Sequence, residues 1–202
     1  MYSGVALLMP FDPDLEGLLT WLLIILAVLA VGGITVYNSL VRLRTQSQGA
    51  WADVDVQLKR RYDLIPNLVE TVKGYAGHEK DTLEAVINAR NRAMSAAGPV
   101  EKAQAENMLS GALKSLFALS EAYPALRAVE SFTSLQGSLG EIEGAVQNAR
   151  RYYNAVVRDY NTKVEQFPSV LIANAFRFEK EEFFEIDDEA QREAPQISFG
   201  DT

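Results

Sequence analysis

The sequence contains no cysteine and a single histidine, His78. The absence of cysteine excludes disulfide bonds, a thiolate nucleophile, a thiolate-ligated zinc or iron–sulfur centre, and a lipid anchor on an N-terminal cysteine. One imidazole can act as a general base, but it cannot by itself form a histidine-rich metal site. The sequence therefore assigns no catalytic, cofactor-binding or metal-binding residues, and no cofactor is expected.

Basic residues are scarce as well. The chain carries 19 Lys and Arg against 27 Asp and Glu, which gives a net charge of −8. A nucleic-acid-binding protein usually has the opposite balance, because it neutralises phosphates with clustered basic side chains. Binding to nucleic acid is accordingly not expected. Hydrophobic residues make up 48% of the chain, which is enough to form a packed core.

One long run of the sequence has no charged residue. Residues 18–36, LLTWLLIILAVLAVGGITV, would form a helix of about 28 Å, close to the thickness of the hydrocarbon core of a bilayer. Trp21 and Tyr37 lie near the two ends of the run, where interfacial aromatic residues are expected. We predict a transmembrane helix over residues 18–36, through which the protein contacts the lipid bilayer.

The charges on either side of this run predict its orientation. Residues 1–17 form a short acidic tail without Lys or Arg, which argues against a cleaved signal peptide. The first basic residues, Arg42 and Arg44, follow the run. By the positive-inside rule we expect a single-pass protein of the cell (inner) membrane, with its N-terminus outside and its C-terminal domain in the cytoplasm.

The remaining apolar residues recur at helical spacing, without the alternation of strands. Helices are expected through residues 51–76, 79–96, 100–121 and 132–164, and the last has a heptad pattern. The fold class expected is all-α: an N-terminal transmembrane helix followed by an elongated antiparallel four-helix bundle with coiled-coil-like packing. The core faces expected are Trp51, Val54, Leu58, Tyr62, Ile65, Val69, Val72 and Ala76; Leu83, Val86, Ile87 and Ala93; Met108, Ala112, Leu116 and Leu119; and Phe132, Leu135, Leu139, Ile142, Val146, Ala149, Tyr153, Val156 and Tyr160.

Pro66 lies inside the first of these helices. Proline removes one backbone hydrogen bond, so we expect a kink that lets the helix curve around the bundle, with a functional hinge as the alternative. Gly74 and Gly77 follow soon after, so a break between helices near them is an equal alternative.

The dipeptide Tyr-Asn occurs at residues 153–154 and again at 160–161, one heptad apart. Both tyrosines fall on the core seam of the last helix, and both asparagines lie beside it. A polar group near such a seam can fix the register of neighbouring helices. A structural role is therefore favoured over ligand binding.

Acidic residues near the single histidine raise an alternative function. Paired carboxylates can perform acid–base chemistry or hold a divalent cation. However, Asp53 and Asp55 are two residues apart and point in different directions on a helix, and Asp55 is placed to pair with Lys59. Solvated ion pairs are favoured. An enzyme or a cation-binding sensor would use Asp53, Asp55, Asp63, Glu70 and His78.

Residues 176–202 form an acidic tail with interspersed aromatic residues. The tail is either solvated and poorly ordered, or a segment that docks into a basic, apolar groove of a partner protein. If it docks, its removal should leave the bundle folded and abolish the capture of that partner. The residues that would bind the partner are Phe178, Glu181, Glu182, Phe183, Phe184 and Glu185.

Five segments of the chain closely resemble the LemA family. They read YNSLV at 37–41, DVDVQLKRRYDLIPNLVETVKGYAG at 53–77, NMLSGALKSLFALSEAY at 107–123, ARRYYNAVVRDYNTKVEQFP at 149–168 and FEKEEFFE at 178–185. The resemblance runs from residue 37 to residue 186 and includes the expected bundle, residues 37–175. It implies an N-terminal membrane anchor followed by an antiparallel helical bundle.

The family has no established activity, and its members are often encoded near membrane metalloproteases. The resemblance therefore implies protein partners, such as a membrane protease or a second copy of the chain. Together with the missing catalytic constellation, it predicts a membrane-anchored, non-catalytic helical scaffold or adaptor that mediates protein–protein interactions at the bacterial membrane.

Overall fold

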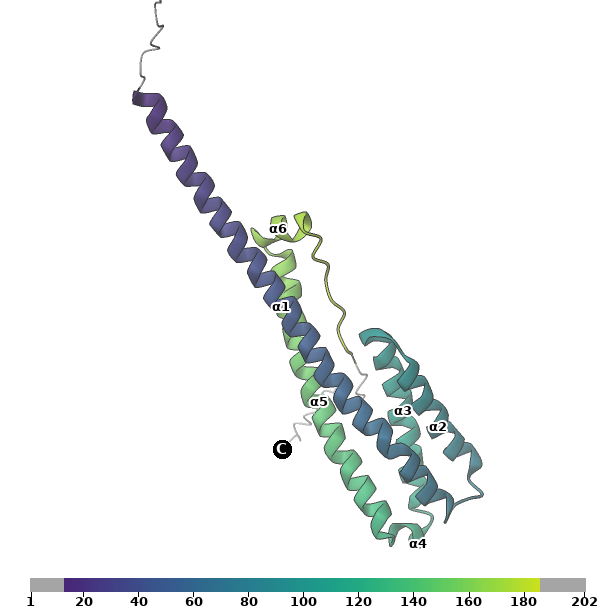
Figure 1. Cartoon of the computed structure of the whole chain (residues 1–202). Coiled ribbons are helices and arrows are strands. Elements are labelled where there is room, and N and C mark those ends of the chain that lie inside the picture. Colours follow the sequence, from purple (N-terminus) through teal and green to yellow (C-terminus); the bar gives the residue numbers. More distant parts are fainter. Residues whose placement is uncertain (1–12, 186–202) are drawn as a thin grey trace, which may run out of the picture.

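The computed structural model describes residues 13–185, which form an elongated helical molecule (Figure 1). The second half of the first helix and three later helices run up and down as an antiparallel bundle, while the first half of that helix projects beyond it. This confirms the all-α fold class. Residues 1–12 of the acidic N-terminal tail and residues 186–202 of the C-terminal tail lie outside the described residues. The elements are α1 (Pro13–Lys73), α2 (Lys80–Ser95), α3 (Gly98–Ser120), α4 (Pro124–Arg127), α5 (Glu130–Glu165) and α6 (Ser169–Ala175).

Helix α1 is a single helix of 61 residues, about 90 Å long. Its residues 18–36 are exposed on almost every side, although nearly all are apolar. A helix that is apolar all round belongs in a lipid or protein interior, and α1 alone among the described helices is long and apolar enough to cross a membrane. From Leu40 onward one face becomes buried in the bundle.

The sequence suggested two places where the first long helix could change course, Pro66 and the glycines at 74 and 77. Only the second of these is a helix end. Pro66 lies inside α1, which continues past it, and the proline is exposed. The helix ends at Lys73, immediately before Gly74. The core face expected for this helix is confirmed, since all of its members from Trp51 to Ala76 are buried or half-buried.

Helix α5 packs along the bundle half of α1 and forms the longest interface of the fold. The heptad pattern predicted for it is confirmed. One position of the heptad is fully buried at every repeat, and the other is buried or half-buried. The fully buried set is Phe132, Leu139, Val146, Tyr153 and Tyr160.

The expected core faces of α2 and α3 need correction. Ile87 is 41% exposed and Met108 is 48% exposed, whereas Ala89 and Leu109 are buried. Both helices contain neighbouring apolar residues that suit two different stripes, so helical periodicity alone did not choose the face. The buried stripe is the one that joins the shared hydrophobic core, which includes Leu109 and in which α2 and α3 pack mainly against each other.

Helices α2 and α3 are much shorter than α5, at 16 and 23 residues against 36, or about 24 and 35 Å against 54 Å. The half of the α1–α5 pair nearest the projecting end of α1 is therefore not covered by α2 and α3. Figure 1 shows what lies there: α6 crosses the end of α5, and residues 177–185 return along α5 as an extended segment.

Candidate functional site

The extended segment leaves α6 through a sharp turn. Arg177 has φ of 56°, and the backbone N–H groups of Arg177 and Phe178 donate to the carbonyls of Asn174 and Ala173. These two bonds form a Schellman motif, which usually has glycine at the left-handed position. The motif points the chain back along α5 and packs Phe178 into a small apolar cluster with Leu40, Tyr160 and Ala173.

Two asparagines of α5 hold the backbone of this segment. The Asn161 amide Nδ2 donates to the carbonyl of Glu181 and its Oδ1 accepts from the N–H of Glu181, both at 2.9 Å. Asn154 makes the same pair of bonds with Phe184, at 3.0 and 2.9 Å. Each asparagine thus satisfies the donor and the acceptor of one residue, as a neighbouring β-strand would.

The preceding tyrosines complete a repeated clamp. The Tyr160 hydroxyl donates to the carbonyl of Glu179 at 2.9 Å, and the Tyr153 hydroxyl donates to that of Glu182 at 2.7 Å. Each Tyr-Asn pair therefore binds two residues of the segment and spans three. One heptad of helix rises about 10.5 Å, and three extended residues span about 10 Å, so the two repeats match in length.

The Tyr-Asn pairs therefore bind the C-terminal segment in addition to lying on the core seam of α5. Every hydrogen bond they make with the segment goes to its main chain, so these bonds recognise an extended backbone whatever its side chains are. The heptad spacing of the two dipeptides was the sequence signal for this site, although it does not by itself reveal what the pairs bind.

Aromatic side chains anchor the segment at both ends. Phe184 is fully buried, and its ring centroid lies 5.4 Å from that of Trp51, which in turn lies 5.2 Å from Tyr153. At the other end, Phe178 lies 5.6 Å from Tyr37. Such aromatic pairs add to the stabilisation from buried area.

The clamping tyrosines stay protonated at neutral pH. Burial, with smaller contributions from the nearby Glu181 and Glu182 carboxylates, raises the pKa of Tyr153 to about 12. Burial also raises the pKa of Tyr160, against the opposing charge of Arg44. Both hydroxyls are therefore donors throughout the physiological range.

The residues predicted to bind a partner all lie in or directly beside this clamped segment. Phe178 and Phe184 face the bundle and are buried, while Phe183 and Glu181 are half-buried. Glu182 and Glu185 are exposed. The apolar members of the predicted set thus contact the chain's own bundle, and the exposed surface of the segment is mainly acidic.

Replacing Asn154 with alanine is expected to remove the protection of one particular amide. Two hydrogen bonds of about 1 kcal/mol each would be lost, so the Phe184 N–H should exchange with solvent roughly 10- to 30-fold faster. Asn161→Ala should do the same at Glu181. Hydrogen–deuterium exchange resolved by residue measures both effects. Asn148→Ala, at an exposed position of α5, is the matched control; an equal effect there would contradict a specific clamp.

A second polar cluster lies between α1, α3 and α5, inside the bundle. Glu106 is fully buried; its carboxylate accepts from Arg61 Nη1 at 2.9 Å and from the Tyr62 hydroxyl at 2.5 Å. Arg61 also contacts Ser110 Oγ at 3.1 Å and the Glu143 carboxylate at 3.0 Å. Burial raises the pKa of Glu106, and the Arg61 guanidinium opposes that rise. Burial, followed by the Glu106 charge, also raises the pKa of Tyr62.

This cluster links three helices of the bundle, α1, α3 and α5, through hydrogen bonds and ion pairs. Its groups satisfy one another, as buried charges must. Sequence reasoning missed the cluster, because Arg61 belongs to a basic run and Tyr62 to an apolar stripe. The available signal was Glu106 itself, a charged residue between the small and apolar positions Ala103 and Leu109.

The residues of the alternative enzymatic function are dispersed. All five are exposed, and no group of three or more potential metal ligands occurs among residues 13–185. The expected contact of Asp55 with Lys59 gives way to one with Lys102, at 3.5 Å, because α3 brings that ammonium group alongside α1. The five residues are Asp53, Asp55, Asp63, Glu70 and His78.

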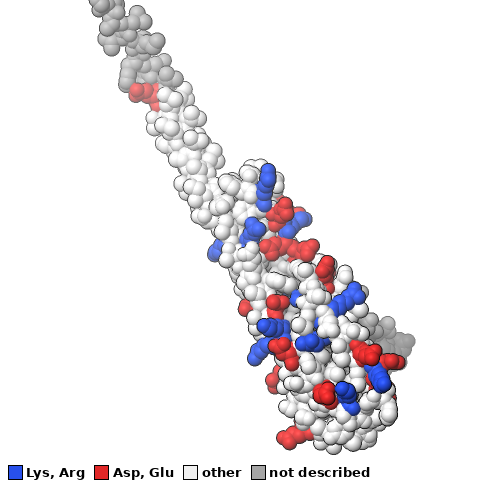
Figure 2. All heavy atoms as spheres, turned by 45° about the vertical axis from the view of Figure 1, so that its right-hand side comes forward, with Lys and Arg blue, Asp and Glu red and all other residues white. Residues whose placement is uncertain are grey.

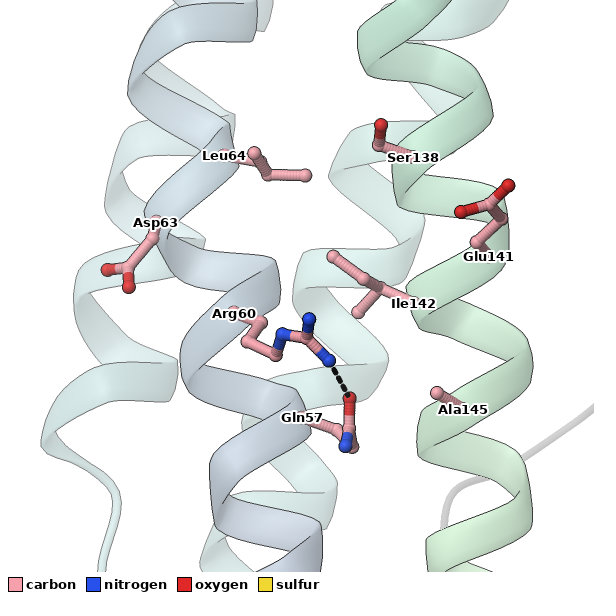
Figure 3. A pocket seen from close by; sticks show the side chains of 8 residues that line it. All are labelled: Gln57, Arg60, Asp63, Leu64, Ser138, Glu141, Ile142 and Ala145. Atoms are coloured by element: carbon pink, nitrogen blue, oxygen red, sulfur yellow. Dashed lines mark hydrogen bonds between the residues drawn. The ribbon is translucent and has the colours of Figure 1, made fainter.

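A shallow groove between α1 and α5, of about 450 Å³, contains one of these residues in its rim (Figure 3). Leu64 and Ile142 point into the space between the helices, whereas the Asp63 carboxylate points away from that space and from Glu141. Arg60 donates to Gln57 at 3.4 Å. The groove therefore presents no pair of converging carboxylates.

The chain is similar to several known proteins. Three relatives are magnetosome proteins: MamQ 1 and MamQ 2 of Paramagnetospirillum magneticum, each 25% identical over 175 residues, and MamQ of Magnetospirillum gryphiswaldense, 24% identical over 174. These matches cover 73–74% of this chain but 64% of each relative, slightly less than two thirds of its length.

A protein named LemA, from Metamycoplasma hominis, is 25% identical over 134 residues, a match that covers 64% of this chain and 60% of the relative. The sequence model of the LemA family matches residues 50–199, well over half of the chain. That range includes residues 50–73 of α1, the buried cluster, both Tyr-Asn pairs and the segment they clamp. The chain belongs to the LemA family.

Proposed function

We propose that this protein is a membrane-anchored, non-catalytic scaffold or adaptor that presents its helical bundle to protein partners at a bacterial membrane. The observation that carries the proposal is the division of α1. Its first half has the all-round apolar surface of a lipid-facing helix, and its second half supplies the core of the bundle. One helix thus connects the membrane segment to the folded domain.

The arrangement of ionisable residues supports a non-catalytic role. The buried charged residues of the part of the chain that the structure describes, Arg61, Lys102 and Glu106, form ion pairs within the bundle. The residues of the enzymatic alternative are dispersed over the surface. Binding to partners requires only an exposed surface, and the acidic outer face of the clamped segment provides one. Glu182 and Glu185 would contact the partner directly, with Glu181 beside them, while Phe178 and Phe184 hold the segment in place.

The partner would be a second copy of the chain or another membrane protein, for which a membrane protease is the candidate that the family resemblance suggests. Three relatives are named as magnetosome proteins, and a role in organising a membrane structure is consistent with those names. Arg42 and Arg44, which follow the apolar half of α1, favour a cytoplasmic bundle.

Crosslinking in native membranes tests the proposal. A photo-crosslinking residue at Glu182 should capture a defined protein partner or a second copy, and one at Glu84, exposed on α2, should not. The capture should persist when Asp53, Asp55, Asp63, Glu70 and His78 are all replaced by alanine. If one of these five changes abolished the cellular phenotype while folding and capture persisted, the protein would act by chemistry and the scaffold function would be refuted.

A further inference from the structure

The apolar surface of the protein does not end with α1. Residues 166–176, which include α6, contain no charged side chain. Three large apolar residues here are exposed: Phe167 by 75%, Leu171 by 61% and Phe176 by 61%. Exposed apolar residues that cluster in this way mark an interaction surface.

This surface is continuous with the apolar half of α1. Ile172 Cδ1 lies 3.7 Å from the position that a Cβ on Gly33 would occupy, and the ring of Phe176 packs edge-on against Tyr37 at 4.8 Å. A groove of about 320 Å³ runs between the two helices and has only apolar or aromatic residues and one glycine in its walls. These residues are Ala30, Gly33, Ile34, Tyr37, Ile172 and Phe176.

The charges on α1 set the depth of α6 relative to a bilayer. Residues 17–41 carry no charge and form about 37 Å of helix, longer than a hydrocarbon core of about 30 Å. With the core beginning near residue 17, Gly33 lies about 24 Å along α1, and Tyr37 about 30 Å. Ile172 is therefore level with the last 6 Å or so of hydrocarbon, and Phe176 with its border.

Charged side chains surround this region without entering it. Figure 2 shows uncharged surface along the projecting part of α1, and Lys, Arg, Asp and Glu residues from the α6 end of the bundle onward. Glu165 and Arg177 are the first charges on either side of the α6 stretch. Aromatic residues at the border and charges just beyond it are typical of a membrane interface.

We propose that α6 is a second membrane contact, in which Phe167, Leu171 and Phe176 insert among the acyl chains of the leaflet from which α1 emerges. The occupant of this surface is lipid, and the groove between α1 and α6 would take part of an acyl chain. Buried to about 5–10 Å, as interfacial helices are, α6 would seat the membrane-proximal end of the bundle on the bilayer. This inference rests on the proposed insertion of α1.

Single cysteines in this cysteine-free chain test the inference cleanly. The full-length protein, labelled with an environment-sensitive fluorophore at Leu171→Cys, is reconstituted into vesicles of phosphatidylcholine and phosphatidylglycerol at high lipid-to-protein ratio. Lipid with a nitroxide high on its acyl chain should remove more than half of the emission, and aqueous iodide should have little effect. Ser134→Cys, exposed at the far end of α5, should show the reverse.

Every other outcome of the quenching experiment overturns the membrane contact of α6 or the membrane anchor itself. Quenching of the Leu171→Cys label by iodide and not by nitroxide lipid would place α6 in water and overturn the inference. Protection from both quenchers would mean that protein covers α6, which also overturns it. A label at Leu26→Cys, which would lie near the bilayer centre, separates the two proposals when it is probed with lipid whose nitroxide is near the end of its acyl chain. If that lipid quenches it while the α6 label stays unquenched, α1 spans the membrane and only the second contact fails. If Leu26→Cys is not quenched, the membrane anchor itself fails.

Discussion

Replacing Phe184 with alanine is expected to destabilise the bundle by about 3 kcal/mol and to release the clamped segment. The ring is fully buried against Trp51, so its removal leaves a cavity at the end of the segment. Urea unfolding in detergent micelles measures the loss through the fluorescence of Trp51. Trp21→Phe removes the other tryptophan of the chain, so that the tryptophan fluorescence comes from Trp51 alone.

The neighbouring Phe183 provides the matched control, because it is the same residue type but only half-buried. Phe183→Ala should cost less than half as much, since less apolar area leaves water at that position. Equal losses for the two variants would contradict the anchoring role of Phe184. Trp51 emission should shift to longer wavelength in Phe184→Ala and remain nearly unchanged in Phe183→Ala.

The contacts of Phe184 also change one expectation from the sequence. Deletion of residues 176–202 was expected to leave the bundle folded, but the deleted stretch contains Phe178 and Phe184, which are both buried in apolar clusters of the fold. Their loss would expose Trp51 and Tyr153 to water. A deletion variant therefore tests folding as much as partner binding, and substitutions at the exposed Glu182 and Glu185 separate the two.

Replacing Glu106 with alanine is expected to cost about 3–5 kcal/mol of stability, because it leaves the buried Arg61 guanidinium without its main partner. The Glu143 carboxylate still contacts Arg61, but it is 38% exposed and hydrated, so it compensates only in part. The same urea titration of the Trp21→Phe protein measures the change. Glu84→Ala, which removes an exposed acid from α2, should leave the midpoint almost unchanged.

A triple variant identifies the cause of that loss. Arg61→Met, Tyr62→Phe and Glu106→Leu together remove the charges and the hydroxyl while keeping the volume, so no buried charge remains unpaired. Replacing a buried ion pair in this way is often neutral or stabilising. The triple variant should therefore recover most of the stability that Glu106→Ala loses. A loss as large as that of the single variant would show that packing, and not the unpaired charge, determines the effect.

The outcome of sequence analysis differs between elements for physical reasons. The heptads of α5 and the stripe of α1 specified their buried faces, because each has one apolar residue at every required position. Adjacent apolar residues such as Met108 and Leu109 suit two different faces of α3, so periodicity could not predict which face is buried. Tertiary packing in the shared core determines that face. The length and apolarity of residues 18–36 were sufficient to predict a candidate membrane helix.

The sequence could not show where the C-terminal segment lies. Its clamp is made by hydrogen bonds from side chains of α5 to the backbone of the segment, and backbone groups are the same in every residue. The Tyr-Asn repeat was visible at 153–154 and 160–161, but the match between one heptad and three extended residues appears only when both are seen together. Likewise, the Arg61–Glu106 contact joins residues on separate helices, and no local sequence pattern predicts that these two residues are in contact.

The uninterrupted course of α1 has a mechanical consequence. With its apolar half in a bilayer, the remaining residues 37–73 form an arm of about 55 Å, stiffened by α5. Transmembrane helices adjust their tilt to the thickness of the surrounding bilayer. A change in tilt of about 10° would sweep the far end of the arm through roughly 10 Å, and the distal loops would respond to the thickness of the bilayer as the tip of a lever does.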